Sequence, residues 1–134
     1  MEARKVIEIN LKHLPLPCPL NQLYRSVQIC VKGRMINKSI LSARARRCRD
    51  ALCLAITMQL RSRPRLNRPC TLSYSITKPD KRVRDIDAYN KQLLDCLEAS
   101  GVVMNDSVIT MSNAEMMPVP KRPGWIDLVL QELP

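Results

Sequence analysis

The chain has 134 residues, 46% of them apolar and only 3% aromatic, which fits one domain with its own hydrophobic core and excludes a disordered or fibrous protein. Its 22 Lys and Arg residues against 12 Asp and Glu residues give a net charge of +10, which favours an anionic partner. No apolar run approaches the roughly 18 residues that span a bilayer, and the N-terminus lacks a signal-peptide pattern, so we expect a soluble, cytoplasmic protein with a single domain over residues 1–134.

The first part of the chain is predicted to form three strands. Alternating apolar residues predict a strand over residues 5–11, which stops at a cluster of prolines between residues 15 and 19. Short apolar segments over residues 27–31 and 35–41 then predict a hairpin that turns at Gly33.

A helix is predicted over residues 43–61, where apolar residues recur at helical spacing after Ser42, a suitable N-cap. Its first turns carry Arg44, Arg46 and Arg47, although the helix dipole disfavours positive charge there. Helix stability therefore does not explain these arginines. Either they bind an anionic partner or their long stems cover apolar surface, and for any single arginine the two explanations are equally good.

The second part of the chain is predicted to add a strand, an amphipathic helix and three short strands. Alternation predicts the strand over residues 71–77, and apolar spacing of three to four predicts the helix over residues 86–100, with Gly101 as its C-terminal cap. The further strands are expected over residues 102–104, 107–112 and 126–131. This order predicts an α+β domain in which a mixed β-sheet packs against two main helices.

The positive charge is concentrated in one part of the sequence. Residues 25–84 contain sixteen Lys and Arg residues and two acids, whereas residues 85–134 contain three Lys and Arg residues and eight acids. Solubilising surfaces usually mix the two signs, so this stretch favours nucleic acid or an anionic membrane. Helices that bind a membrane surface use Trp or Phe, which the stretch lacks, so nucleic acid is the better candidate. Binding to single strands uses aromatic stacking, for which the chain has few residues, so we expect contact with the phosphates.

The cysteines do not indicate a zinc site. Six cysteines are scattered without a Cys-x-x-Cys pair, and the chain has one histidine, His13. We expect them to be small, buried and reduced side chains.

Three carboxylates suggest metal chemistry. Asp85 and Asp87 flank the predicted start of the second helix within the most basic surroundings, and Asp106 follows that helix in a turn. Carboxylates there would repel the phosphates that the arginines attract. A Mg²⁺ or Mn²⁺ ion would resolve this conflict, because it bridges carboxylates to phosphate and activates water. The three can meet only if Asp106 lies on a strand that runs back beside Asp87. Asp80, Asp95 and Glu98 suit solvated or ion-paired roles.

Lys91 lies one helical turn after Asp87, where its ammonium could stabilise charge that develops on a phosphate. When the spacing of Asp87 and Lys91 is considered alone, an ordinary ion pair explains it better than a catalytic role. Asp-x-Asp is also a weak motif by itself.

The segment that carries these residues resembles a known signature. The sequence PDKRVRDIDAYNKQLLDCL at residues 79–97, followed by Gly101 and by NDSV at residues 105–108, is similar to the RusA family of Holliday junction resolvases. The shared pattern is a basic run, Asp-x-Asp, a Lys four residues later, an apolar helix that ends at Gly, and an Asp in a turn. The segment from Leu14 to Arg25 resembles the family's proline-rich entry. The family commonly has Asn at the position of Ala88.

The resemblance implies a RusA-like fold and a homodimeric, Mg²⁺-dependent endonuclease that cuts four-way DNA junctions with paired, symmetric nicks. It implies metal ligands at Asp85, Asp87 and Asp106, and a catalytic lysine at Lys91. Phosphate contacts are expected from basic side chains of the charged stretch, namely Arg25, Arg44, Arg46, Arg47, Lys81, Arg82 and Arg84. A basic DNA-binding protein without activity, and a metal nuclease with less preference for branched DNA, remain as alternatives.

Overall fold

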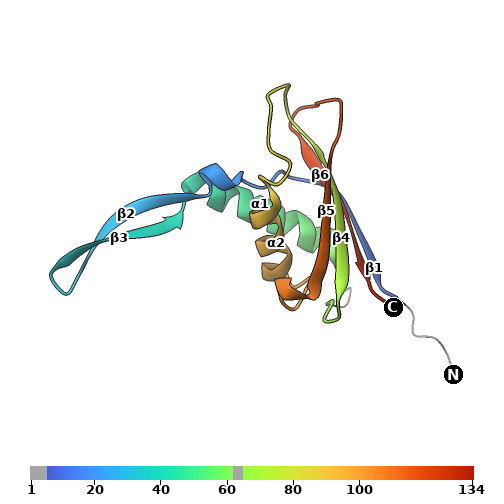
Figure 1. Cartoon of the computed structure of the whole chain (residues 1–134), viewed down its shortest axis with the longest axis horizontal. Helices are drawn as coiled ribbons and strands as arrows, with labels where there is room; N and C mark the ends of the chain where they lie inside the picture. The colour runs from blue at the N-terminus through green and yellow to red at the C-terminus, as the bar shows by residue number, and fades with distance from the viewer. Residues whose placement is uncertain (1–5, 62–64) are drawn as a thin grey trace.

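The central element of the fold is a four-stranded sheet covered on one face by two helices (Figure 1). The computed structural model describes residues 6–61 and 65–134. The strands follow the order β1-β6-β4-β5; β4 and β5 are parallel and the other neighbours are antiparallel. Their bounds are β1 (Glu8–Leu14), β4 (Cys70–Thr77), β5 (Ile109–Met116) and β6 (Trp125–Glu132). The predicted α+β fold with a mixed sheet is confirmed.

The core lies between the sheet and the helices α1 (Ala43–Leu60) and α2 (Asn90–Ala99). Every second residue of the central strands is buried, as the period of a strand requires. Both helices turn an apolar face toward these residues, with Leu52 and Ile56 from α1 and Leu93 and Leu97 from α2. In the part of the chain that is described, no helix has the length and apolarity needed to cross a membrane.

A separate two-stranded hairpin projects from this body (Figure 1). It consists of β2 (Tyr24–Val31) and β3 (Arg34–Leu41), and we call it the arm. Lys32 and Gly33 form its turn with positive φ, as the predicted hairpin requires. No residue of either strand is fully buried. The prediction that the cysteines are buried is confirmed for Cys18, Cys70 and Cys96, whereas Cys48 and Cys53 are half-buried and Cys30, on the arm, is exposed.

The root of the arm is fixed to α1 by a small second core. Cys18, Leu23 and Ala45 are buried there, and Leu41 packs against them. Ser42 caps α1 as predicted, since its hydroxyl oxygen accepts a hydrogen bond from the backbone N–H of Ala45 at 3.0 Å. The short 3₁₀ helix η1 (Leu20–Gln22) leads into the arm.

The unit β4–α2–β5 determines where the predicted site residues lie. The chain leaves β4, runs through a long loop, returns along α2 and enters β5 parallel to β4. Gly101 ends α2 with φ +78°, and its N–H donates to the Glu98 carbonyl, which confirms the predicted cap. A second 3₁₀ helix, η2 (Asp106–Val108), precedes β5.

The second helix begins at Asn90 and not at residue 86 as predicted. The residues before it form tight turns, in which the N–H of Ala88 donates to the carbonyl of Asp85 and the N–H of Asn90 to that of Asp87. The Ala88 carbonyl accepts from the N–H of Leu20 at 2.8 Å, so it is occupied by a partner outside the helix. Tertiary hydrogen bonding therefore overrides the apolar spacing on which the prediction relied.

Three predicted strands also differ from the structure. The strand predicted over residues 5–11 runs over Glu8–Leu14, because an irregularity at His13 lets it continue to Leu14. Residue 5 lies outside the described residues. Residues 102–104 form only an isolated bridge to Leu66. The strand predicted over residues 107–112 starts at Ile109, because Asn105 caps the turn before it through the N–H of Ser107.

Candidate functional site

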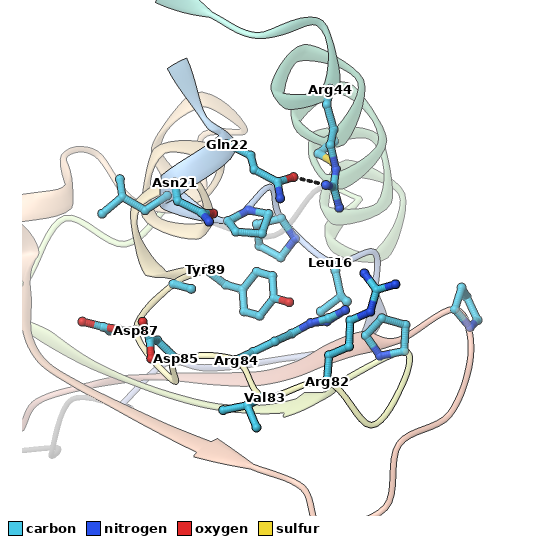
Figure 2. Close-up of a pocket in the computed structure, with 17 residues that line it drawn as sticks. Leu16, Asn21, Gln22, Arg44, Arg82, Val83, Arg84, Asp85, Asp87 and Tyr89 are labelled. Atoms are coloured by element: carbon cyan, nitrogen blue, oxygen red, sulfur yellow. Dashed lines mark hydrogen bonds between the residues drawn. The ribbon is translucent and has the colours of Figure 1, made fainter. Parts of the chain in front are cut away.

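A cleft of about 740 Å³ opens beside the N-terminal end of α2. Its walls come from the proline-rich segment at residues 16–22, the first turns of α1 and the loop at residues 79–89, and Pro123 adds to them from the loop before β6 (Figure 2). The hydrogen bond between Leu20 and Ala88 joins the first wall to the third. Segments from four parts of the sequence therefore form one site, held in part by the main chain.

Asp85 and Asp87 lie together at one end of this cleft (Figure 2). Both are exposed, and neither carboxylate forms a hydrogen bond or ion pair with another side chain among residues 6–61 and 65–134. The turns before α2 hold their backbones, with both carbonyl oxygens accepting at 3.2 Å. Two adjacent unpaired carboxylates are ligands that a hard divalent cation prefers.

Three arginines, Arg44, Arg82 and Arg84, line the same cleft. The guanidinium of Arg84 donates to both carboxylate oxygens of Asp80, at 3.1 and 3.2 Å. The backbone N–H of Arg82, together with the Arg84 and Arg82 guanidinium groups, holds the pKa of Asp80 below its usual range. Arg44 donates to the side-chain oxygen of Gln22, while Arg82 is largely exposed and lies 4.0 Å from the Asp80 carboxylate. The cleft thus combines three cations with the two acids.

Lys91 forms the ordinary ion pair that its spacing allowed, but with a different partner. Its Nζ donates to Asp95 at 3.0 Å, one turn further along α2, and not to Asp87. This hydrogen bond and the charge of Asp95 raise the pKa of Lys91, with smaller contributions from Tyr24 and Asp106. Both side chains of the pair are about half exposed, so the pair contributes little and does not lock the lysine in place.

Asn90 is a residue that the sequence interpretation did not assign to the site. Its Oδ1 accepts from the hydroxyl of Tyr74 on β4 at 3.0 Å and from that of Ser112 on β5 at 3.4 Å. Burial, and then the charge of Asp87, raises the pKa of Tyr74, so its phenol remains a donor. These two hydrogen bonds fix the orientation of the Asn90 amide group. An Asn at the start of an amphipathic helix is too common a signal to have identified it.

Asp106 does not join the other two predicted metal ligands. The ten residues of α2 span about 15 Å, and Asp106 follows the C-terminal end of that helix while Asp85 and Asp87 precede the other end. Strand β5 does run back beside β4, but Asp106 precedes its first residue. In the described ranges, no three His, Cys, Asp or Glu side chains are grouped to hold a metal ion. Among the described residues, Asp106 therefore lies apart from Asp85 and Asp87.

The remaining predicted phosphate contacts lie outside the cleft. Arg25 is on the arm, Arg46 and Arg47 are on exposed turns of α1, and Lys81 is on the loop after β4. All four side chains are exposed and accessible to a large anionic ligand.

Comparison of the chain with protein-family models gives no match, and comparison with curated proteins gives none either.

Proposed function

We propose that this chain is a metal-dependent endonuclease of the cytoplasm that resolves four-way DNA junctions by paired, symmetric cuts. The observation that carries the proposal is the pair of unpartnered carboxylates, Asp85 and Asp87, in a cleft that three arginines also line. Such acids repel a phosphate unless a cation lies between them. The resemblance of residues 79–108 to RusA resolvases supplies the junction as the substrate.

The donor set fits a magnesium or manganese ion. Mg²⁺ commonly binds proteins through one or two carboxylates and completes its shell with water and substrate phosphate oxygens. Asp85 and Asp87 are exposed carboxylates of this kind, so they would hold the ion without a third acid. When bound, such an ion polarises a phosphoryl oxygen and lowers the pKa of a water molecule.

The cationic side chains of the cleft would bind and orient the DNA backbone. Arg84 is fixed by Asp80 and gives a preorganised contact for a phosphate, and Arg44 faces the cleft from α1. Lys91 can leave its weak pair with Asp95 and place its ammonium where negative charge develops on the phosphoryl oxygens. The arginines thus bind the DNA backbone, and Lys91 stabilises the transition state.

Paired cuts in opposed strands of a two-fold junction need two such sites. A symmetric homodimer supplies them, and this assembly is part of the proposal because the resemblance implies it. Sedimentation of the purified protein with and without a synthetic junction measures the stoichiometry directly.

The test is the dependence of binding and cutting on the metal. We expect the protein to bind an end-labelled synthetic junction in EDTA and to cut it only after Mg²⁺ or Mn²⁺ is added. Binding without cutting at any metal concentration would favour a DNA-binding protein without activity. Equal cutting of linear duplex would favour a nuclease with less preference for branched DNA.

A further inference from the structure

The arm carries positive charge that nothing in the described structure neutralises. Its four charged side chains are all cations, Arg25, Lys32, Arg34 and Lys38. The sequence has no acid between Glu8 and Asp50, and none of the four cations forms an ion pair with a residue that the structure describes. Fold stability gives no reason for this charge, because neither strand contributes a fully buried residue.

The two faces of the arm differ in chemistry. One face carries no charge, and it bears the neutral polar pairs Ser26–Ser39 and Gln28–Asn37 together with the pairs Tyr24–Leu41 and Cys30–Met35. The other bears the pair Ile29–Ile36 and further apolar residues, with three of the four cations among them. That second face consists of Arg25, Val27, Ile29, Val31, Arg34, Ile36, Lys38 and Ile40. Cations on long stems beside β-branched side chains suit a surface that is both anionic and partly apolar.

The arm begins at the candidate site and leads away from it. Leu20, Asn21 and Gln22, which precede β2, line the cleft, and Arg44, shortly after β3, lines it from α1. Figure 1 shows the hairpin extending from this point to one side of the body. Eight residues per strand give a length of about 26 Å, which is the rise of about eight base pairs of duplex.

We infer that the arm is a second DNA-binding surface, which lies along the backbone of a duplex segment that leaves the cleft. The inference rests on the proposed function for its ligand. Sugar and phosphate present the partly apolar, anionic surface that the charged face of the arm fits, and a two-stranded ribbon is narrow enough to follow a groove. A second copy of this chain is the less suitable partner, because its net charge is +10.

The experiment compares two triple variants that change the charge equally. Lys32→Asn, Arg34→Gln and Lys38→Gln remove three cations from the arm, and Asn suits the positive φ of residue 32. Lys12→Gln, Arg68→Gln and Lys121→Gln remove three exposed cations from the body outside the cleft. Both variants have net charge +7, since three of the ten excess positive charges are lost. Urea unfolding of each variant checks that the body remains folded.

The measurement is junction affinity in EDTA as a function of salt, by fluorescence anisotropy. Each lost phosphate contact flattens the log–log slope by about 0.9, so the arm variant should have a slope shallower by about 2 to 3 and the control by less than 1. Equal slopes for the two variants would overturn the inference. The inference would also be overturned if the wild type were a dimer and the arm variant a monomer, because the arm would then be an interface between copies.

The result can be separated from the proposed function. If the wild type binds and cuts the junction but the arm variant has the same salt slope as the control variant, only the role of the arm is contradicted. Binding that depends on the arm, without cutting in any metal, contradicts only the endonuclease proposal. A wild type that binds no DNA contradicts both.

Discussion

At the scale of single residues, the ion pair between Lys91 and Asp95 allows catalysis and stability to be tested apart. Lys91→Ala and Asp95→Asn both break the 3.0 Å contact, so each should change the free energy of unfolding by no more than about 0.5 kcal/mol. If Lys91 acts on the phosphate, only Lys91→Ala lowers single-turnover cleavage, while Asp95→Asn frees the ammonium and leaves the rate equal or higher. Parallel losses in both variants would reduce Lys91 to a surface ion pair.

Asp87 has a different role, and its replacement should separate binding from cutting. We expect Asp87→Asn to abolish cleavage and to leave junction binding intact or tighter, because the change removes a metal ligand and a repulsion toward phosphate. Gel-shift and cleavage assays on the same junction measure both. Weak binding with normal cutting of the bound fraction would show that Asp87 is not a ligand.

At the scale of the elements, the glycine before β6 fixes the position of one cleft wall. Gly124 has φ +79°, and a Cβ there would lie 2.9 Å from the Thr77 carbonyl oxygen and 2.7 Å from Leu16. Gly124→Ala should therefore destabilise the fold by roughly 1 to 3 kcal/mol, measured by urea unfolding. Gly33→Ala is the matched control, since Gly33 has φ +77° with no atom within 4 Å, and a loss of equal size there would mean that the close contacts have no effect.

The first turns of α1 present their arginines next to the cleft. Replacing Arg44, Arg46 and Arg47 with Gln should flatten the salt dependence of junction binding and leave the cutting rate of the saturated complex nearly unchanged. The reason is that these side chains are assigned to phosphates and lie on a different element from Asp87. A salt slope identical to that of the wild type would mean that this part of α1 faces solvent in the complex.

Elements whose boundaries are set by local chemistry could be predicted from the sequence. The N-cap Ser42, the turn at Gly33 and the cap at Gly101 all lie where the residue types indicated. The start of α2 could not be predicted, because it depends on a hydrogen bond from Leu20, far away in sequence. The same limit applies to Asp106. The sequence places it after α2, but whether the chain then brings it back beside Asp87 depends on the packing of β5 and could not be predicted.

At the scale of the whole molecule, the distribution of charge relates the cleft to the arm. The sixteen basic residues at positions 25–84 include those of the arm, of the N-terminal turns of α1 and of the loop before α2. The turns of α1 and the loop line the cleft, and the arm leads away from it. The two acids that line this cleft, Asp85 and Asp87, lie at one end of it (Figure 2). This arrangement is what a protein that binds phosphates and cuts next to a bound cation requires.

The most direct test of this account is the rate at which the wild-type protein cuts a synthetic four-way junction and a linear duplex of matched sequence, with Mg²⁺ and with EDTA. The account predicts paired nicks in opposed strands of the junction with Mg²⁺, little cutting of the duplex, and none of either in EDTA. Cutting that continues in EDTA, or a junction that is bound and never cut in Mg²⁺ or Mn²⁺, would contradict it.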